Sequence, residues 1–445
     1  MSDAATAASQ AGPSGAAGVD VVDSEAESER YLRRNFSAGL VHGVFFQAAA
    51  AFGDINTVLP SFLALLTSST VAVGLMAALQ GFGEIVPQMF TAYLIEDRPR
   101  KKPYLLWIIT VRWVSWAVLA WLTFSYGTTR PELILGILIA LFSLFSIAGG
   151  MGTVVYADVF SKAIPTLRRG RFTGWKQLLG YALAIGAGYL VKFILDQPDR
   201  FPYPTNYALI FLLSSIGLFI AFAGFAMIRE PVYPVQRVSQ SLGALLRRSV
   251  KLAQGNSNFR RLLAARALTT AGLALAPFYV VYARQEVGVS AGMVGLYLAA
   301  QMAGGALSNL LWGWLSDRFG NRAVLIGISV TGGMAPLLAL LAPGISTALF
   351  VPVFFFLGAT ISGMRLGYSN FILEMAPLGL RPTCVALQNT LLTPVALLPL
   401  AVGGVLQVIS YPTLLGIGLV IMTANLIMTF LILDPRHDPA GACVS

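Results

Sequence analysis

The sequence contains few charged residues, and this shortage excludes most kinds of soluble protein. Only 11% of the 445 residues are Asp, Glu, Lys or Arg, whereas soluble domains carry about 25%. Apolar residues make up 56% of the chain, and its mean hydropathy is +0.72. Because too few polar side chains are available to cover a water-facing surface of this size, a soluble enzyme is excluded.

Cysteine and histidine are also scarce. The two cysteines, Cys384 and Cys443, have no Cys or His neighbour at the spacing of a metal site, and they cannot form a disulfide framework. His42 and His437 have no Ser or Cys nucleophile beside them, and the chain has no Walker loop that could bind ATP. We therefore expect no catalytic residues, no metal, no cofactor and no enzyme activity.

Twelve long apolar runs dominate the sequence. A run of about 18 residues is long enough to cross a bilayer core of about 30 Å as a helix. The runs cover residues 37–65, 70–95, 104–126, 131–157, 173–195, 205–228, 259–284, 290–312, 322–342, 346–373, 383–409 and 411–433. We therefore expect an all-α polytopic membrane protein with twelve transmembrane helices in a lipid bilayer.

Lys and Arg are distributed asymmetrically along these runs. If the N-terminus is cytoplasmic, 23 of the 30 lie in inner segments, Lys176 among them, while four lie in outer segments and three within helices. Because inner loops carry an excess of Lys and Arg, both termini are predicted to be cytoplasmic, in a plasma or bacterial inner membrane. This topology also explains the net charge of +10 without a nucleic-acid partner.

The pattern predicts five segments. Residues 1–29 carry no Lys or Arg and lack the apolar stretch of a signal peptide. The polar, basic segment between the halves includes an amphipathic stretch that suits anionic lipid. The segments are a disordered cytoplasmic tail (1–34), an N-terminal six-helix bundle (35–228), a basic linker with an interfacial helix (229–258), a C-terminal six-helix bundle (259–434) and a cytoplasmic tail (435–445).

Landmark residues recur between the two halves. Tyr156, Asp158, Pro165 and Arg169 are followed 212 residues later by Tyr368, Asn370, Pro377 and Arg381. The Asp-Arg pair at residues 97–98 recurs 220 residues later, at residues 317–318. This agreement of spacing predicts two six-helix bundles related by a parallel repeat, as in some transporters.

Residues 313–322, with the sequence Gly-Trp-Leu-Ser-Asp-Arg-Phe-Gly-Asn-Arg, carry a recognisable loop motif. They resemble the G-x-L-x-D-R-x-G-x-R/K signature of the major facilitator superfamily. The counterpart at residues 93–102 keeps Asp97, Arg98 and Lys102 but lacks both glycines. The resemblance covers residues 35–434, and it implies a twelve-helix, monomeric secondary transporter that binds a small-molecule substrate and alternates between inward-open and outward-open states.

The loop motif also has a physical interpretation as a cytoplasmic gate. Gly313 and Gly320 permit close helix packing and a tight turn. Asp317 can accept hydrogen bonds from a helix N-terminus or from an arginine. We expect these residues, with the charges of Asp97, Arg98, Arg318 and Arg322, to latch the cytoplasmic faces of the two bundles in one state. Alternatively, the charges only set topology and loop structure.

Four ionisable residues fall within apolar runs: Asp54, Glu84, Arg112 and Arg365. An ionisable group near mid-bilayer costs at least about 2.5–3.5 kcal/mol on insertion scales, so it is a functional candidate. None of the four has a charged counterpart in the other half, and residues that break the repeat are the better candidates for chemistry. Arg266 and His42 lie nearer the cytoplasmic boundary, which their side chains can reach.

The superfamily resemblance suggests roles for these four residues. It implies that the first and fourth helices of each half line the path, so that Asp54 and Arg365 face the cavity and Arg112 lies nearer the periphery. Burial raises the pKa of a carboxyl group and a nearby cation lowers it, so Asp54 or Glu84 is a candidate proton carrier. Arg365 indicates an anionic group on the substrate. Alternatively, Glu84 and Arg112 form a structural ion pair.

Together, these features indicate a secondary active transporter that moves a small organic solute, anionic in one version of the hypothesis, with coupling to protons. An exporter of hydrophobic drugs or metabolites is one alternative, although the fifth run lacks the Gly-Pro of the superfamily's antiporter signature. The other alternative is a non-transporting membrane sensor or assembly factor that binds a partner through residues 229–258.

Overall fold

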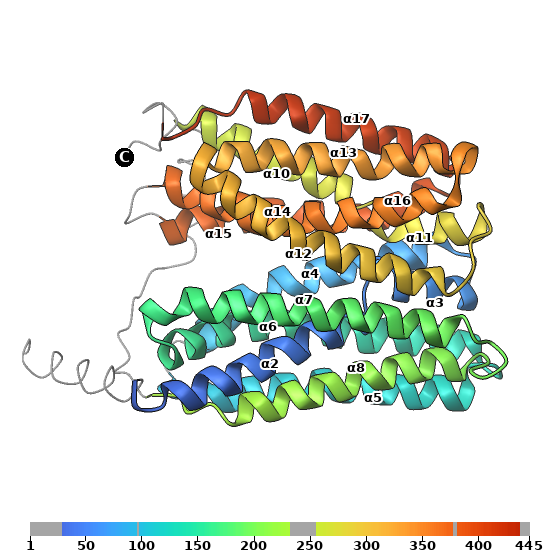
Figure 1. Cartoon of the computed structure of the whole chain (residues 1–445), viewed down its shortest axis with the longest axis horizontal. Coiled ribbons are helices and arrows are strands. Elements are labelled where there is room, and N and C mark those ends of the chain that lie inside the picture. Colours follow the sequence, from blue (N-terminus) through green and yellow to red (C-terminus); the bar gives the residue numbers. More distant parts are fainter. Residues whose placement is uncertain (1–28, 96–97, 232–254, 377–380, 437–445) are drawn as a thin grey trace, which may run out of the picture.

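The computed structural model describes residues 29–95, 98–231, 255–376 and 381–436. Within these ranges the chain folds into helices, with no β-strand (Figure 1). The predicted N-terminal tail, linker helix and C-terminal tail fall mainly on residues 1–28, 232–254 and 437–445, which lie outside the described residues, as does Asp97.

The N-terminal half forms six spans, the first of which is broken. Its helices are α2 (Leu32–Phe52), α3 (Val58–Leu66), α4 (Thr70–Ile95), α5 (Lys102–Tyr126), α6 (Pro131–Ala163), α7 (Thr166–Leu195) and α8 (Thr205–Ala226). Residues 53–57 separate α2 from α3, so the apolar run expected to be one helix over 37–65 is interrupted. Pro131 begins α6, where its missing N–H would have had no partner in the helix.

The C-terminal half also forms six spans, and here the break in the first is shorter. Its elements are α10 (Ser257–Leu273), α11 (Ala276–Gln285), α12 (Met293–Phe319), α13 (Asn321–Ile345), η1 (Thr347–Leu349), α14 (Phe350–Met375), α15 (Arg381–Leu392), η3 (Thr393–Leu397), α16 (Leu398–Val405) and α17 (Tyr411–Phe430). Two prolines, Pro336 and Pro343, lie inside α13. Such prolines are tolerated in membrane helices because neighbouring groups satisfy the freed carbonyls.

The described chain contains eleven helical segments that are long and apolar enough to cross a membrane. The first span is not among them, because α3 has only 9 residues and α2, although 21 residues long, is less apolar and carries Arg33 and Arg34. With this broken span included, the chain has the twelve expected spans. The protein is therefore an integral membrane protein.

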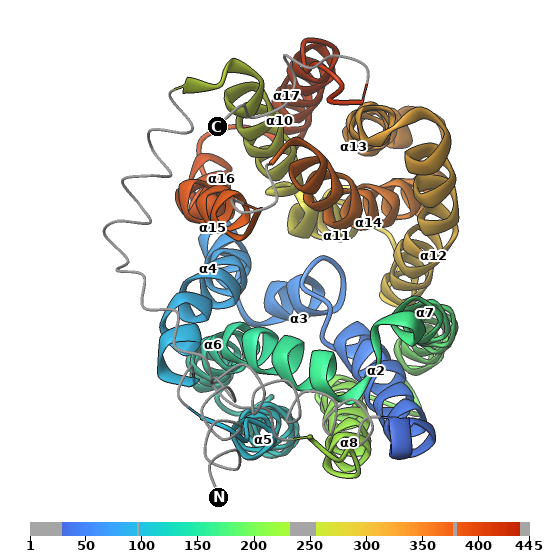
Figure 2. The ribbon, with the colours of Figure 1, turned by 90° about the vertical axis from the view of Figure 1, so that its left-hand side faces the viewer.

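The helices of the two halves gather on opposite sides of the molecule. Figure 2 looks along the helices, with α5, α6 and α8 on one side and α13, α14 and α17 on the other. Most of the packing across the boundary joins α7 to α12 and α4 to α16, and α3 also packs against α11. The central region between the halves is therefore bordered by helices from both repeats.

The buried core differs between the two ends of the molecule. Around α3 and α11, one apolar cluster contains residues of both halves, including Phe62, Tyr279 and Phe350. At the opposite end, where α2 and α10 begin, each half has its own separate cluster. We call the α3/α11 end the closed end, and the opposite end, which carries Arg98 and Arg318, the basic end.

The predicted repeat is visible in individual hydrogen bonds at the basic end. Arg169 Nε donates to the carbonyl oxygen of Ile164 at 3.0 Å. At a shift of 212 residues, Arg381 Nε donates to the carbonyl oxygen of Ala376 at 3.4 Å. The same side chain therefore caps the end of the fourth span in each half.

A second pair of equivalent contacts joins the first and last spans of each half. Asn35 Nδ2 donates to the carbonyl oxygen of Arg229 (3.0 Å), and the Arg229 N–H donates back to Asn35 Oδ1 (2.9 Å). Asn258 and Leu433 form the same reciprocal pair, at 3.0 and 2.8 Å. Both asparagines are fully buried. These bonds fasten the chain that leaves the sixth span to the start of the first.

Candidate coupling and substrate site

Asp54 lies in the break between α2 and α3, and its carboxylate organises that break. Asp54 Oδ1 accepts hydrogen bonds from the Asn56 N–H at 3.0 Å and from Thr57 Oγ1 at 2.8 Å. Asp54 Oδ2 accepts one from Gln301 Nε2 at 2.9 Å. Gln301 is a buried residue of α12, in the other half. The carboxylate therefore satisfies donors at the break and also connects the two halves.

Packing fixes the same break. Trp116 of α5 fills the space beside Gly53, where a Cβ atom would lie 2.3 Å from the indole ring. Trp116 is only 4% exposed, and it packs edge-on against Phe145 of α6 with ring centroids 5.6 Å apart. Residue 53 therefore has no room for a side chain unless the ring moves.

Three further hydrogen bonds join the halves within the described ranges. They run from Arg284 Nη1 to Ser61 Oγ (2.8 Å), from Thr70 Oγ1 to the Gly403 carbonyl oxygen (2.6 Å) and from Asn309 Nδ2 to Gln177 Oε1 (3.0 Å). The first two belong to the closed end, and the third lies near the middle of α7 and α12. No ion pair between described residues crosses the boundary.

Glycines bring the two backbones into contact at the closed end. A Cβ atom on Gly295 of α12 would lie 2.1 Å from the backbone nitrogen of Lys192 and 2.4 Å from the carbonyl oxygen of Gly188. A Cβ atom on Gly74 of α4 would lie 2.1 Å from the carbonyl oxygen of Pro399. Side chains at these glycines would therefore prevent the observed contact between the halves.

Arg112 lies inside the N-terminal half. Its guanidinium carbon lies 4.0 Å from the ring centroid of Phe145 and 4.8 Å from that of Phe46. A Cβ atom on Gly149 of α6 would lie 3.4 Å from the same carbon. Arg112 Nε is buried without a hydrogen-bond partner. The expectation that Arg112 lies near the periphery is wrong, because the long side chain extends from α5 to the space between α2 and α6.

Glu84 is exposed and does not form the ion pair that was considered for it. Glu84 Oε1 accepts a hydrogen bond from Gln80 Nε2, one turn earlier on α4, at 3.0 Å. No salt bridge joins Glu84 to Arg112. The structural ion pair between these two residues is therefore absent from this state of the protein.

Lys176 is a cation of this region that was predicted to lie in an inner segment. It lies on α7, ten residues after the first residue of that helix. Its aliphatic stem fills the space beside Gly43 of α2, where a Cβ atom would lie 2.4 Å from Lys176 Cδ. Its ammonium nitrogen lies 5.7 Å from the ring centroid of Tyr156. Lys176 has neither a hydrogen bond nor an ion pair with any described residue.

His42 lies between aromatic rings beside these cations. Its ring stacks on Tyr156 with centroids 5.6 Å apart, and it lies 5.9 Å from the ring of Phe46. His42 Nδ1 is 2.9 Å from the Ala221 carbonyl oxygen, so it donates a hydrogen bond that fixes the ring. The side chain is 6% exposed. His42 therefore does not extend to the molecular surface, which differs from the expectation.

Two arginines of the C-terminal half lie in different settings. Arg365 on α14 is exposed and has no hydrogen bond or ion pair with a described residue. Ser362, three residues earlier and thus on a neighbouring face, donates to Asn309, which in turn contacts the other half. Arg266 on α10 donates from Nη2 to Asn389 Oδ1 at 3.3 Å. Arg365 is thus the unpaired one of the two.

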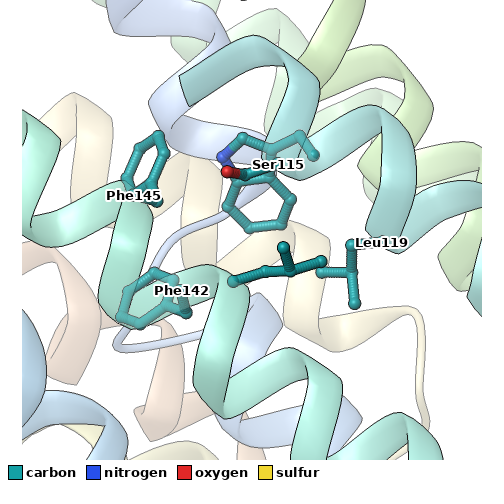
Figure 3. Close-up of a pocket in the computed structure, with 6 residues that line it drawn as sticks. Ser115, Leu119, Phe142 and Phe145 are labelled. Carbon is teal, nitrogen blue, oxygen red and sulfur yellow. The ribbon is translucent and has the colours of Figure 1, made fainter. Parts of the chain in front are cut away.

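A small apolar pocket lies between α5 and α6 (Figure 3). Its lining consists of Ser115, Trp116, Leu119, Leu141, Phe142 and Phe145. The Ser115 hydroxyl donates to the Val111 carbonyl oxygen at 2.7 Å, so it is not available to a ligand. This pocket therefore lacks the polar groups that a hydrophilic solute needs, although Phe145 links it to Arg112.

Comparisons with known proteins agree with this arrangement. Residues 262–442 match the model of the Major Facilitator Superfamily. The nucleoside transporter NupG has the same fold, with a TM-score of 0.70 at 14% identity over 90% of this chain and 100% of that chain. The C-terminal half of the chain therefore resembles this superfamily in sequence, and the whole chain has the fold of these solved transporters. No curated protein sequence matches it.

Two more solved transporters have this superfamily fold. A D-xylose-proton symporter has a TM-score of 0.69 at 14% identity, over 92% of this chain and 99% of that chain. A bacterial homologue of the iron transporter ferroportin, in its inward-facing state, has a TM-score of 0.62 at 15% identity, over 90% and 99%. At these identities the likeness shows the fold.

The superfamily loop at residues 313–322 is anchored within its own half. Gly320 adopts a φ of +82°, a conformation that favours glycine, so the expected tight turn is present. Arg322 Nη2 donates to the Phe430 carbonyl oxygen at 2.8 Å. A Cβ atom on Gly313 would meet nothing within 4 Å. The expected close helix packing at Gly313 is therefore not observed.

The charges of this loop do not connect the halves in the described chain. Asp317 and Arg318 are exposed, as is Arg98 in the first half, and none of them forms an ion pair with a described residue. The cytoplasmic latch therefore stays a prediction for a state in which the basic end is closed.

Proposed function

We propose that the protein is a secondary active transporter that moves a small organic solute across the plasma membrane, as a monomer with both termini in the cytoplasm. One chain supplies both bundles, and the Lys and Arg excess supports the orientation. The proposal adds alternating access to the fold: the halves separate at the closed end and come together at the basic end. This cycle is supported by the apolar cluster that joins the two halves at the closed end, while each half has a separate cluster at the basic end.

The observation that carries the proposal is the hydrogen bond between Asp54 and Gln301. It joins a carboxylate at a helix break to an amide on the other half, at 2.9 Å. Opening of the closed end would separate these two groups and admit water to Asp54. An ionised carboxylate is costly within a membrane, so its protonation depends strongly on what surrounds it. Asp54 is thus the residue at which we expect proton exchange and opening to be coupled.

Solved transporters with this fold are consistent with such an activity. They include a nucleoside transporter and a D-xylose-proton symporter, so the same architecture carries small polar organic solutes and couples one of them to protons. We assign this chain the same general activity, with Asp54 as its proton-binding residue. Glu84 is the second candidate because it is exposed and forms no ion pair.

The test is solute-driven proton flux into proteoliposomes that contain the pH indicator pyranine. A panel of sugars, nucleosides, short peptides and organic anions is added in turn, with the membrane potential clamped. We expect one class to acidify the lumen of wild-type vesicles. Asp54→Asn should abolish this acidification while retaining counterflow exchange of the same radiolabelled solute, because the neutral amide cannot carry the proton.

Asp199→Asn is the matched control. Asp199 is an exposed carboxylate in the turn after α7 and forms no ion pair with a described residue, so its loss should leave the proton flux unchanged. Proton flux that persists in Asp54→Asn would reject the role of Asp54. Absence of flux for every solute, in protein that is folded and correctly oriented, would favour a sensor or assembly factor.

A further inference from the structure

Two cations in the N-terminal half lack a carboxylate partner. Arg112 on α5 and Lys176 on α7 form no ion pair with any described residue. Arg112 Nε is buried without a hydrogen bond. Each unpaired cation within a membrane protein costs several kcal/mol, so such groups usually face a partner or a water-filled path. Here the printed contacts of both cations are with aromatic rings, and Glu84 lies near Arg112 but beyond the distance of a salt bridge.

A row of aromatic rings connects the two cations. Lys176 lies over Tyr156 (5.7 Å), Tyr156 stacks on His42 (5.6 Å), His42 lies beside Phe46 (5.9 Å), and Arg112 lies over Phe46 (4.8 Å). The rings come from α2 and α6, which line the space between them with these side chains. The row therefore has a positive group at each end and flat apolar surfaces between.

The row is held in place but is not fully covered. The hydrogen bond from His42 to Ala221 and the packing of Lys176 against Gly43 fix the positions of the groups. In contrast to buried His42, the side chains of Phe46, Arg112, Tyr156 and Lys176 are each only partly buried. The helices therefore leave part of each of these four side chains uncovered.

We propose that Arg112 and Lys176 bind the carboxylates of a planar organic dianion, whose apolar body lies along the partly buried rings of Phe46 and Tyr156. This inference rests on the proposed function, since it names the class of the transported solute. Guanidinium binds a carboxylate in a bidentate manner, and ammonium binds one as a point charge. A small inorganic anion would contact one cation and leave the other unpaired, which favours a solute with two separated charges.

The test uses purified full-length protein in detergent and three probes of similar size. Terephthalate carries two carboxylates on a flat ring, terephthalamide has the same shape without charge, and benzoate carries one carboxylate. Isothermal titration calorimetry at pH 7 should show binding of terephthalate, about tenfold or more weaker binding of benzoate, and none of terephthalamide. A charge-assisted hydrogen bond contributes about 1.5–3 kcal/mol, which corresponds to tenfold or more in affinity.

Variants then assign the site. Lys176→Gln and Arg112→Gln should each weaken terephthalate binding about tenfold or more, whereas Lys192→Gln, a cation of the same helix as Lys176 near the closed end, should leave it unchanged. If a variant fails to fold, the wild-type contrast between terephthalate and terephthalamide still decides. Equal affinity for those two probes, no binding of terephthalate, or unchanged binding in Lys176→Gln would overturn the inference.

The outcomes also separate this inference from the proposed function. Binding in detergent requires neither a gradient nor Asp54. If another solute drives proton flux but terephthalate does not bind, the dianion site is rejected and the proposed transport activity is supported. If terephthalate binds but no solute drives flux, the dianion site is supported and the proposed transport activity is rejected.

Discussion

The first span is broken in both halves, but only the N-terminal break carries a charge. Residues 53–57 separate α2 from α3 and include Asp54, whereas Ala274 and Leu275 alone separate α10 from α11. The Asp54 carboxylate accepts three hydrogen bonds at its break. The C-terminal break is apolar and buried. Both halves thus have a broken first span, and only the N-terminal half has a titratable residue, Asp54, at the break.

The basic ends of the halves are more alike than their centres. The reciprocal bonds of Asn35 and Asn258 and the caps by Arg169 and Arg381 are equivalent in the two halves. In the central region, by contrast, Arg112 has no charged counterpart. This difference indicates that the shared residues maintain each bundle, while the unshared residues distinguish its chemistry.

The largest expected effect concerns the shared asparagines. Asn35→Ala and Asn258→Ala each remove a reciprocal pair of buried hydrogen bonds and leave backbone groups unpaired, so each should lower the free energy of unfolding by about 2–3 kcal/mol. Thermal unfolding in detergent, followed by tryptophan fluorescence, measures both. A much larger loss of unfolding free energy for one of the two variants would show that the two pairs of hydrogen bonds are not equivalent.

An intermediate effect is expected at the break itself. Gly53→Ala places a methyl group against the Trp116 ring, and such overpacking costs about 1–3 kcal/mol. The variant should lose stability and solute-driven proton flux together, because the Asp54 loop is displaced. Trp116→Leu in the same chain should restore part of both. Gly136→Ala, where the space is open, is the matched control; equal behaviour of the two glycine variants would contradict the role assigned to Trp116.

The smallest expected effect concerns a second pair of equivalent caps. Lys102 Nζ donates to the Ala226 carbonyl oxygen at the end of α8, and Arg322 donates to the Phe430 carbonyl oxygen at the end of α17. Lys102→Met and Arg322→Met should each cost about 0.5–1 kcal/mol, because a cation at a helix C-terminus is only a modest stabiliser. The same unfolding assay applies, and a loss above that of the asparagine variants would reverse the order.

The spans and the repeat could be predicted from the sequence because apolar length and matched spacing are one-dimensional signals. The break at residues 53–57 could not, since it lies inside an apolar run and depends on Trp116 and Gln301 from distant segments. The apolar run also predicted too short a helix for α7, which begins at Thr166 rather than near residue 173. Lys176, only three residues into the predicted run, was therefore counted with the inner segments, although it lies about 15 Å along the helix.

The candidate site was predicted only in part. The position of Asp54 and Arg112 within apolar runs identified them as candidates. In the structure Gly53, next to Asp54, packs against Trp116, which contacts the Phe145 ring below Arg112. The direction of a long side chain, however, depends on the neighbours of its helix. Arg112 could therefore be placed near the periphery by its helix number and still extend inward between α2 and α6.

The glycine contacts at the closed end have a consequence for the speed of the transport cycle. Where Gly295 meets Lys192 and Gly188, two smooth backbone surfaces touch without interlocking knobs. Such surfaces can separate without a change of side-chain rotamers, so the steric barrier to their separation is low. The rate at which the interface at the closed end opens would then depend chiefly on the few hydrogen bonds between the halves, among them the one that Asp54 accepts from Gln301.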